Sequence, residues 1–170
     1  DDGLEGWASQ SATPDALWQH SDAQIQSGTG AVWFGNADTG NYEGVGAVSG
    51  TLTSPETLLP LPSGDGSKLH AKFGLYLETE WSAAGPYINP AGLDRLTLQV
   101  VDAAQNATEV WASDLIDGST DGAWSEISVN ISAWSGQAVR FRFVFDSVDA
   151  NANNFLGPFV DNFVVERSCD

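Results

Sequence analysis

Short runs in which hydrophobic and polar residues alternate recur along most of the chain. The clearest run has Val139, Phe141, Phe143 and Phe145 at alternate positions, with Arg140 between the first two. A period of two puts one set of side chains on one face of a β-strand, whereas the helical period of 3.6 is nearly absent here. Eight such runs predict strands, over residues 31–35, 48–53, 71–77, 96–101, 108–112, 124–131, 139–145 and 159–166.

The stretches between these runs are rich in Gly, Asn, Asp and Pro, which form turns and loops. Many short strands separated by such loops are typical of an antiparallel sandwich. We therefore expect an all-β fold, an antiparallel β-sandwich of the jelly-roll type. Its 170 residues suit a single domain over residues 1–170, and no internal repeat or linker divides them. Because the chain opens on Asp1 rather than Met, we interpret it as a module excised from a longer protein, with adjacent domains as partners.

Charge narrows the classes of partner. The chain has 23 acidic and 6 basic residues, a formal net charge of −17. So few cations cannot neutralise a nucleic-acid backbone, so we expect no nucleic-acid binding. No apolar run approaches the roughly 20 residues that a membrane helix needs, so we expect no membrane insertion. Strong acidity suits a saline extracellular setting, which predicts a secreted or cell-surface protein.

Enzyme motifs are scarce. Neither G-x-S-x-G nor H-E-x-x-H occurs in the chain. Glu78 and Glu80 alternate on a predicted strand, about 7 Å apart by strand rise. Such a pair is compatible with glycoside hydrolysis, which uses two carboxylates across a cleft. It is one of many acid pairs in so acidic a chain, so we expect no enzyme and keep a glycan-active enzyme as a remote alternative.

Acidic residues gather where the predicted strands end. Ca²⁺ takes six to eight oxygen ligands from carboxylates, amides, backbone carbonyls and water, and loops rich in Asp, Asn and Gly supply all of these. Taken singly, each acid is a solvated turn residue; taken together, with so few cations to balance them, they predict bound Ca²⁺. The candidate metal ligands in and beside the loops are Asp2, Glu43, Glu78, Glu80, Asp94, Asp146 and Asp149.

Asp161 is a further candidate ligand, within the last predicted strand. It shares parity with Phe159, Phe163 and Val165, which predicts that its carboxylate is buried. A buried carboxylate without a partner is costly, so it needs a cation, an arginine or backbone N–H donors. All three alternatives remain open at this point.

Aromatic residues beside the polar loops suggest a ligand surface. Trp33 and Trp81 lie next to the acid-rich loops, with Tyr42 and Tyr87 nearby and Asn36 in one of those loops. Flat aromatic side chains beside polar groups are what sugar-binding modules present, although packing that caps the sandwich gives the same pattern. The predicted ligand-binding residues are Trp33, Asn36, Trp81 and Tyr87.

Several segments also resemble one family. Gly6-Trp7 after an acidic opening, Trp33-Phe34-Gly35-Asn36, Leu75-Tyr76-Leu77-Glu78-Thr79-Glu80 and Phe159-Val160-Asp161-Asn162 are similar to the MAM-like jelly-roll modules of secreted bacterial proteins. Those modules accompany immune-inhibitor-A-type metallopeptidases. The resemblance implies a non-catalytic, calcium-binding sandwich used in adhesion, in docking or in stabilising a neighbouring domain.

The resemblance also divides the acids into two groups. It implies one cation held by Asp2, Asp161 and Glu43. A second cluster would draw on Glu78, Glu80, Asp94, Asp146 and Asp149.

Two departures from the family matter. The family has Glu-Gly-Trp where this chain has Leu156-Gly157-Pro158, so an acid and an aromatic are missing there. Cys169 is the only cysteine, so the other MAM disulfides cannot form.

The functional hypothesis is a non-catalytic, calcium-binding module that mediates adhesion through a glycan or a surface-protein ligand. A purely structural accessory domain of a secreted peptidase or glycanase is the alternative.

Overall fold

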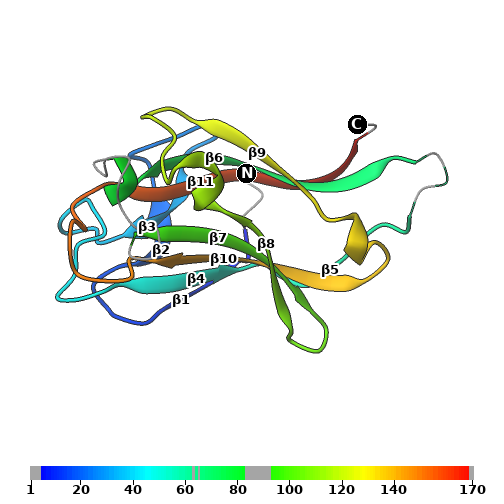
Figure 1. The fold of residues 1–170 in the computed structure, drawn as a ribbon, viewed down its shortest axis with the longest axis horizontal. Helices are drawn as coiled ribbons and strands as arrows, with labels where there is room; N and C mark the ends of the chain where they lie inside the picture. Colours follow the sequence, from blue (N-terminus) through cyan, green and yellow to red (C-terminus); the bar gives the residue numbers. More distant parts are fainter. Residues whose placement is uncertain (1–4, 63, 65, 83–92, 169–170) are drawn as a thin grey trace.

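A computed structural model describes residues 5–62, 64, 66–82 and 93–168. The described chain forms two antiparallel sheets packed face to face, and the chain crosses between them several times (Figure 1). Short 3-10 helices in the described connections include η1 (Glu80–Ser82), η3 (Ser113–Ile116) and η4 (Ser132–Trp134). The expected all-β antiparallel sandwich of the jelly-roll type is confirmed.

Each sheet has a central pair of long strands. Sheet A runs in the order β1 (Ala8–Ser11), β4 (Ser49–Thr53), β10 (Ala138–Asp146), β7 (Arg95–Asp102) and β8 (Ala107–Ala112), and β5 (Thr57–Leu58) also pairs with β10. Sheet B runs in the order β2 (Leu17–Ser21), β3 (Ala31–Gly35), β11 (Gly157–Ser168), β6 (Lys68–Glu78) and β9 (Ser125–Asn130).

The core lies between the sheets and is rich in aromatic rings. Phe141, Phe143 and Phe145 of β10 are buried on its inner face, as the alternation predicts. From the opposite sheet, Phe73 meets Phe143 edge-on at 5.0 Å between ring centroids, and Phe34 lies 5.1 Å from Phe145. Rings of this size bury large apolar areas and prefer such tilted contacts.

All eight predicted strands are present, and three strands were not predicted. β1 is exposed at every position, so it has no alternation to detect. β2 buries only Trp18 among its five residues, and β5 is two residues long. These strands are held by pairing with β4, β3 and β10 and carry little of the hydrophobic pattern themselves.

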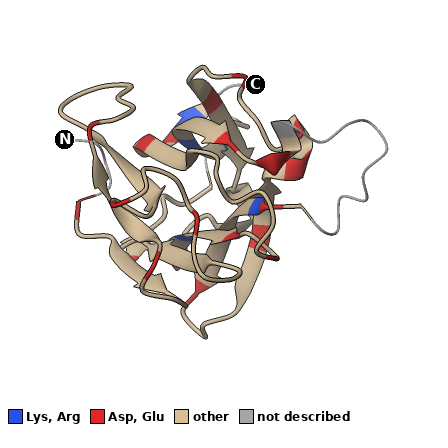
Figure 2. Ribbon diagram, turned by 90° about the vertical axis from the view of Figure 1, so that its left-hand side faces the viewer, with Lys and Arg blue, Asp and Glu red and all other residues tan. Residues whose placement is uncertain are grey.

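Several connections meet at one end of the sandwich. Because β1, β3, β6, β8 and β10 all run toward this end, the described segments that follow them come together there: residues 12–16, 36–48, 79–82 with 93–94, 113–124 and 147–156. We call this the loop end, and it lies on the left of Figure 1. Figure 2 looks onto it and shows acidic residues spread over several of its loops. The topology thus gathers acids that are far apart in the sequence.

A β-bulge in β11 overturns the parity predicted for Asp161. The register with β6 shifts between Asp161 and Val164, and Asn162 takes the left-handed conformation with φ of 53°. Before the bulge, Phe159 faces the outside of sheet B; after it, Phe163 faces the core. Asp161 is therefore buried, as predicted, but on the outer side of sheet B.

Candidate functional site

A buried carboxylate lies at the centre of the loop end. Asp94, immediately before β7, is 0% exposed. The Tyr42 hydroxyl donates a hydrogen bond to Asp94 Oδ2. The backbone N–H of Asp94 donates to Glu80 Oε1 at 3.2 Å. Asp94 Oδ1 has no hydrogen-bond partner within the described part of the chain. A buried carboxylate oxygen without a donor is costly, so this position favours a further ligand.

Tyr42 reaches Asp94 because its loop is anchored to its neighbours. The ring packs edge-on against Phe145, 5.1 Å between centroids, and its backbone N–H donates to Phe155 O at 3.3 Å. Gly157 passes so close that an added Cβ would lie 3.0 Å from the Tyr42 ring, and its φ of 80° also favours glycine.

The connection between β10 and β11 forms a second wall of the loop end. Asp149 accepts hydrogen bonds from Asn151, from its backbone N–H at 2.6 Å and its amide at 2.9 Å. Buried Asn153 donates to Asp149 O at 3.1 Å and to Ser147 Oγ at 3.2 Å. Asn153 Oδ1 has no hydrogen-bond partner among the described residues, which adds a second buried oxygen without a donor.

The electrostatics link these acids. Burial raises the pKa of Asp94 to about 7, and the charges of Glu80 and Asp149 act in the same direction against its Tyr42 hydrogen bond. Burial also raises the pKa of Glu80, with a contribution from Asp149. Burial and the charge of Asp94 raise the pKa of Tyr42, so Tyr42 remains a hydrogen-bond donor. The structure therefore brings Glu80, Asp94 and Asp149 near one another. The hydrogen-bond donors around them do not satisfy all of their carboxylate oxygens.

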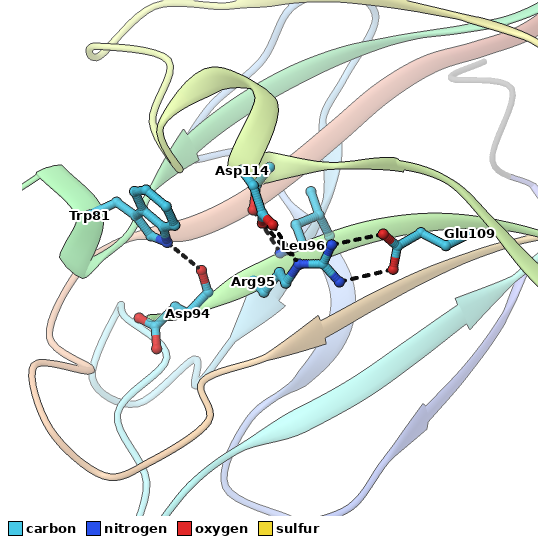
Figure 3. A network of polar contacts seen from close by, with 7 residues as sticks. Trp81, Asp94, Arg95, Leu96, Glu109 and Asp114 are labelled. Atoms are coloured by element: carbon cyan, nitrogen blue, oxygen red, sulfur yellow. Dashed lines mark hydrogen bonds and ion pairs between the residues drawn. The ribbon is translucent and has the colours of Figure 1, made fainter. Parts of the chain in front are cut away.

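Trp81 closes one side of this cluster. Its indole N–H donates to Asp94 O at 3.0 Å, so the ring packs over the start of β7 (Figure 3). Gly118 permits this packing, because a Cβ at that position would lie 2.2 Å from the Trp81 ring. Trp81 remains partly exposed.

Arg95 points away from the Asp94 carboxylate, although the two residues are adjacent (Figure 3). Its guanidinium binds Glu109 through two hydrogen bonds of 2.8 and 2.7 Å, and its Nε donates to Asp114 Oδ1 at 2.8 Å. These carboxylates keep the pKa of Arg95 above its ordinary value. Arg95 thus joins β7, β8 and η3, and it does not neutralise Asp94.

Other predicted metal ligands have separate surroundings. Glu78 accepts a hydrogen bond from Tyr76 Oη at 2.6 Å on the outer face of sheet B. Asp146 accepts one from the Val148 N–H at 2.9 Å, and Glu43 is exposed. No hydrogen bond among the described residues joins these three to the Asp94 cluster. Asp2 lies outside the described residues.

Asp161 has backbone N–H donors. Its Oδ2 accepts from Gln26 at 3.2 Å and Ser27 at 3.0 Å, and its Oδ1 accepts from the Asn162 N–H at 2.7 Å. Of the three alternatives for its partner, the structure shows this one. A cation shared with Asp2 stays a prediction.

Only some of the predicted ligand-binding residues are accessible to a ligand. Trp33 is 6% exposed, stacks on Phe159 and donates to Leu156 O at 2.6 Å, so it packs sheet B and presents no open face. Asn36 is half-buried, and its Oδ1 accepts from the Asp38 N–H at 2.9 Å. Tyr87 lies outside the described residues. Of the four, Asn36 and Trp81 are partly open at the loop end.

No group of three or more His, Cys, Asp or Glu side chains within the described ranges could hold a metal ion. A Ca²⁺ ion there would need neutral oxygens as well as carboxylates, which its coordination chemistry allows. The buried oxygens of Asp94 and Asn153 fit this requirement. Apart from the metal question, no described helix is long and apolar enough to span the hydrocarbon core of a membrane.

Two residues of this cluster were not predicted as ligands or partners. Tyr42 lies among loop residues, and no local pattern shows that its hydroxyl reaches Asp94, which is 52 residues away in the sequence. Asn153 is one of several asparagines in its loop. Burial distinguishes it from Asn151 and Asn154, and burial depends on the folded structure.

Comparisons with known proteins show the fold. No family model matches the chain, and no curated protein matches its sequence. Among solved structures, the chain is similar to a carbohydrate-binding module, TmCBM61, in complex with β-1,4-galactotriose. The TM-score is 0.56 and the identity 16%, over 97% of this chain and 90% of that chain.

A second similar structure is the enzymatically active domain of tailspike protein 4 of bacteriophage CBA120. The TM-score is 0.52 and the identity 10%, over 97% of this chain. This chain spans 20% of that one. Both likenesses support a β-sandwich, and the MAM-like assignment stays a prediction.

Proposed function

We propose that the chain is a non-catalytic module that binds carbohydrate. The observation that carries this proposal is the likeness to the galactotriose-bound module over nearly the full length of both chains. Partly exposed Trp81 and Asn36 at the loop end supply an aromatic face and an amide, which sugar sites combine. The same proposal places the module in a secreted or cell-surface protein of the MAM-like kind, beside other domains, and gives it a role in adhesion. A surface protein is the other kind of ligand that we propose.

The test of carbohydrate binding is titration calorimetry with a panel of polysaccharides that includes β-1,4-galactan. We expect saturable binding to at least one neutral or acidic glycan, and weaker binding by Trp81→Ala. A matched control is Trp134→Ala, which changes a half-buried tryptophan in η4, outside the loop end. Absence of binding to every glycan would overturn the proposal and favour a purely structural accessory domain.

We further propose that Ca²⁺ binds at the loop end. Its ligands would come from the carboxylate of Asp94 and one of Glu80 and Asp149, with the side-chain oxygen of Asn153, backbone carbonyls and water completing the set. The support is the unpartnered Oδ1 of Asp94, which lies in a fully buried residue beside two further acids. Bound Ca²⁺ would supply positive charge to these acids and tie the loops that carry them.

A thermal melt of chelator-treated protein, with and without millimolar Ca²⁺, tests this site. A ligand that binds only the folded state stabilises it by about 2.7 kcal/mol at a hundredfold excess over Kd. For a domain of this size, the midpoint should rise by several degrees, about 2–4 °C per kcal/mol. Mg²⁺ is the control ion, because it is smaller and demands stricter octahedral geometry. A melting midpoint that Ca²⁺ leaves unchanged would contradict the proposed calcium site.

The likeness to a tailspike domain described as enzymatically active favours testing one alternative, a glycan-active enzyme that uses Glu78 and Glu80. Hydrolysis by Glu78 and Glu80 requires both carboxylates to face one substrate. Here Glu78 binds Tyr76 on the outer face of sheet B, whereas Glu80 binds the Asp94 backbone at the loop end. We therefore expect no release of reducing ends from any glycan in the panel. Turnover that Glu78→Gln abolishes would establish the enzyme instead.

A further inference from the structure

The outer face of sheet A gathers half of the positive charge of the chain. Arg140 and Arg142 alternate on β10, and Arg95 lies on the adjacent strand β7. The chain has only six basic residues against 23 acidic ones. Alternate positions on a strand are about 7 Å apart, so Arg140 and Arg142 lie side by side on this face. Like charges at this spacing repel each other unless something neutralises them.

Arg142 is not neutralised within the described structure. Its cross-strand neighbours are Thr53 on β4 and Gln99 on β7, both uncharged. Its one hydrogen bond among the described residues runs from Nε to Thr53 Oγ1 at 3.3 Å, and it forms no ion pair with them. The side chain is half-buried in the centre of the sheet. Its two terminal nitrogens are therefore available to a ligand.

The other two arginines differ in how firmly they are paired. Arg95 is held by Glu109 and Asp114 at 2.7 and 2.8 Å. Arg140 approaches Glu56 only to 3.9 Å, with 39% of its side chain exposed, and donates to Ser54 O at 3.3 Å. Positive charge therefore remains at Arg140 and Arg142.

The remaining residues of this face supply hydroxyl and amide groups. Thr51, Thr53 and Gln99 lie in register with Val144 and Arg142 across three strands. A groove over β1, β4 and β10 lies farther along this face, lined by Thr51, Val144 and Asp146 among others, and neither Arg140 nor Arg142 lines it. Guanidinium groups bind carboxylates and sulfates through paired hydrogen bonds, and neighbouring hydroxyls and amides bind sugar hydroxyls.

We propose that the outer face of sheet A, centred on Arg142 and Arg140, binds the acidic groups of a polysaccharide, either uronate carboxylates or sulfate esters. This inference rests on the proposed carbohydrate binding and adds a ligand class and a second contact surface, apart from Trp81 and Asn36 at the loop end. The net charge of −17 repels a polyanion at long range, but salt screens charges more than about 8 Å apart at physiological ionic strength. Direct pairs with Arg142 are screened much less because the side chain is half-buried.

Titration of the whole chain with three polysaccharides tests the inference at physiological ionic strength. Polygalacturonate presents carboxylates, a sulfated galactan presents sulfates, and β-1,4-galactan is neutral. We expect at least one acidic glycan to bind. Arg142→Gln should weaken this binding about tenfold or more, since a charge-assisted hydrogen bond contributes at least that much. Binding of β-1,4-galactan, where present, should be unchanged by this variant.

Arg167→Gln is the matched control, because it removes the same charge from β11, where Arg167 donates to Leu61 O. It should leave acidic-glycan binding within about twofold of the wild type, on the scale of an exposed charge. Arg140→Gln is the second variant and decides the outcome by the same criterion if Arg142→Gln does not fold.

Four results would overturn the inference. Equal losses in the β10 variant and Arg167→Gln would show a non-specific effect of charge, and unchanged binding in the β10 variant would place the site elsewhere. Binding of β-1,4-galactan without either acidic glycan would remove this inference and leave the proposed function standing. Absence of binding to all three would remove both.

Discussion

Asp94 shows how one residue can make stability depend on both pH and a cation. Its carboxylate is fully buried, accepts a hydrogen bond from Tyr42 on one oxygen and has no described donor on the other. Without a cation, the folded state therefore holds the proton more tightly than the unfolded chain does. This difference makes ionisation of Asp94 destabilising.

The first prediction follows from the pKa of Asp94, which burial raises from 3.8 to about 7. Its proton stabilises the folded state below the unfolded pKa, and this stability is lost as the pH rises through about 7. In the presence of a chelator, ionisation of Asp94 should lower the free energy of unfolding by on the order of 3 kcal/mol between pH 5 and pH 8. Urea unfolding of the wild type and Asp94→Asn at both values measures it. The variant should be less sensitive to pH and insensitive to Ca²⁺; parallel pH profiles would contradict this account.

A second prediction concerns Asp161, whose carboxylate accepts hydrogen bonds from three backbone N–H groups. Asp161→Ala leaves these donors without an acceptor, which should lower the free energy of unfolding by about 2–3 kcal/mol. Asp161→Asn keeps one oxygen acceptor and should lose less. The backbone role predicts the same calcium-induced rise in melting midpoint as in the wild type. Loss of that rise in a folded Asp161 variant would instead favour a cation shared with Asp2.

At the scale of elements, the strands that line the core were predictable and those at the periphery were not. β10 carries four buried hydrophobic residues at alternate positions, so its inner face could be predicted from the sequence. β1 is exposed throughout and is a strand because it pairs with β4. Hydrophobic alternation reports burial, whereas edge strands depend on hydrogen bonds that alternation does not encode.

The bulge at Asn162 marks a second limit of the sequence pattern. A period of two predicts Asp161 and Phe163 on the same face, but one extra residue in the ladder puts them on opposite faces. The site was affected in the same way: acids at strand ends could be predicted, but their partners could not. Glu78 and Glu80 are two residues apart yet bind Tyr76 and the Asp94 backbone in separate places.

A third prediction concerns the contact by which Arg95 joins β7 to β8. Arg95 and Glu109 form a two-bond ion pair, but their side chains are 36% and 42% exposed. Water screens such a pair, so the coupling free energy should be about 0.5–1 kcal/mol. A double-mutant cycle with Arg95→Gln and Glu109→Gln measures it by urea unfolding. A coupling above about 2 kcal/mol would mean that the pair acts as a buried one.

At the scale of the whole molecule, the net charge of −17 opposes the compact state. Acidic residues are spread over several loops at the loop end (Figure 2), so repulsion acts between segments as well as within them. The fold is stable only if the aromatic core outweighs this repulsion. The balance should therefore depend on ionic strength.

The fourth prediction is that monovalent salt stabilises the protein in the absence of Ca²⁺. Raising NaCl from about 0.01 M to 0.15 M shortens the screening length from about 30 Å to 8 Å, so the melting midpoint should rise. An equal osmolality of sucrose is the control for effects unrelated to charge. A midpoint that falls or stays constant in NaCl would show that repulsion between the acids contributes little to the stability of this chain.

The meeting of distant connections at the loop end also bears on the time course of folding. Tyr42, Asp94 and Asp149 come from three separate segments. We expect these segments to meet only after β10 and β7 pair and β3 reaches the same end. Interactions completed that late act after the folding barrier, so they change the rate of unfolding and leave the rate of folding nearly constant. Stopped-flow measurements should show slower unfolding in Ca²⁺ and an unchanged folding limb. Calcium would then prolong the lifetime of each folded molecule without helping the next one to fold.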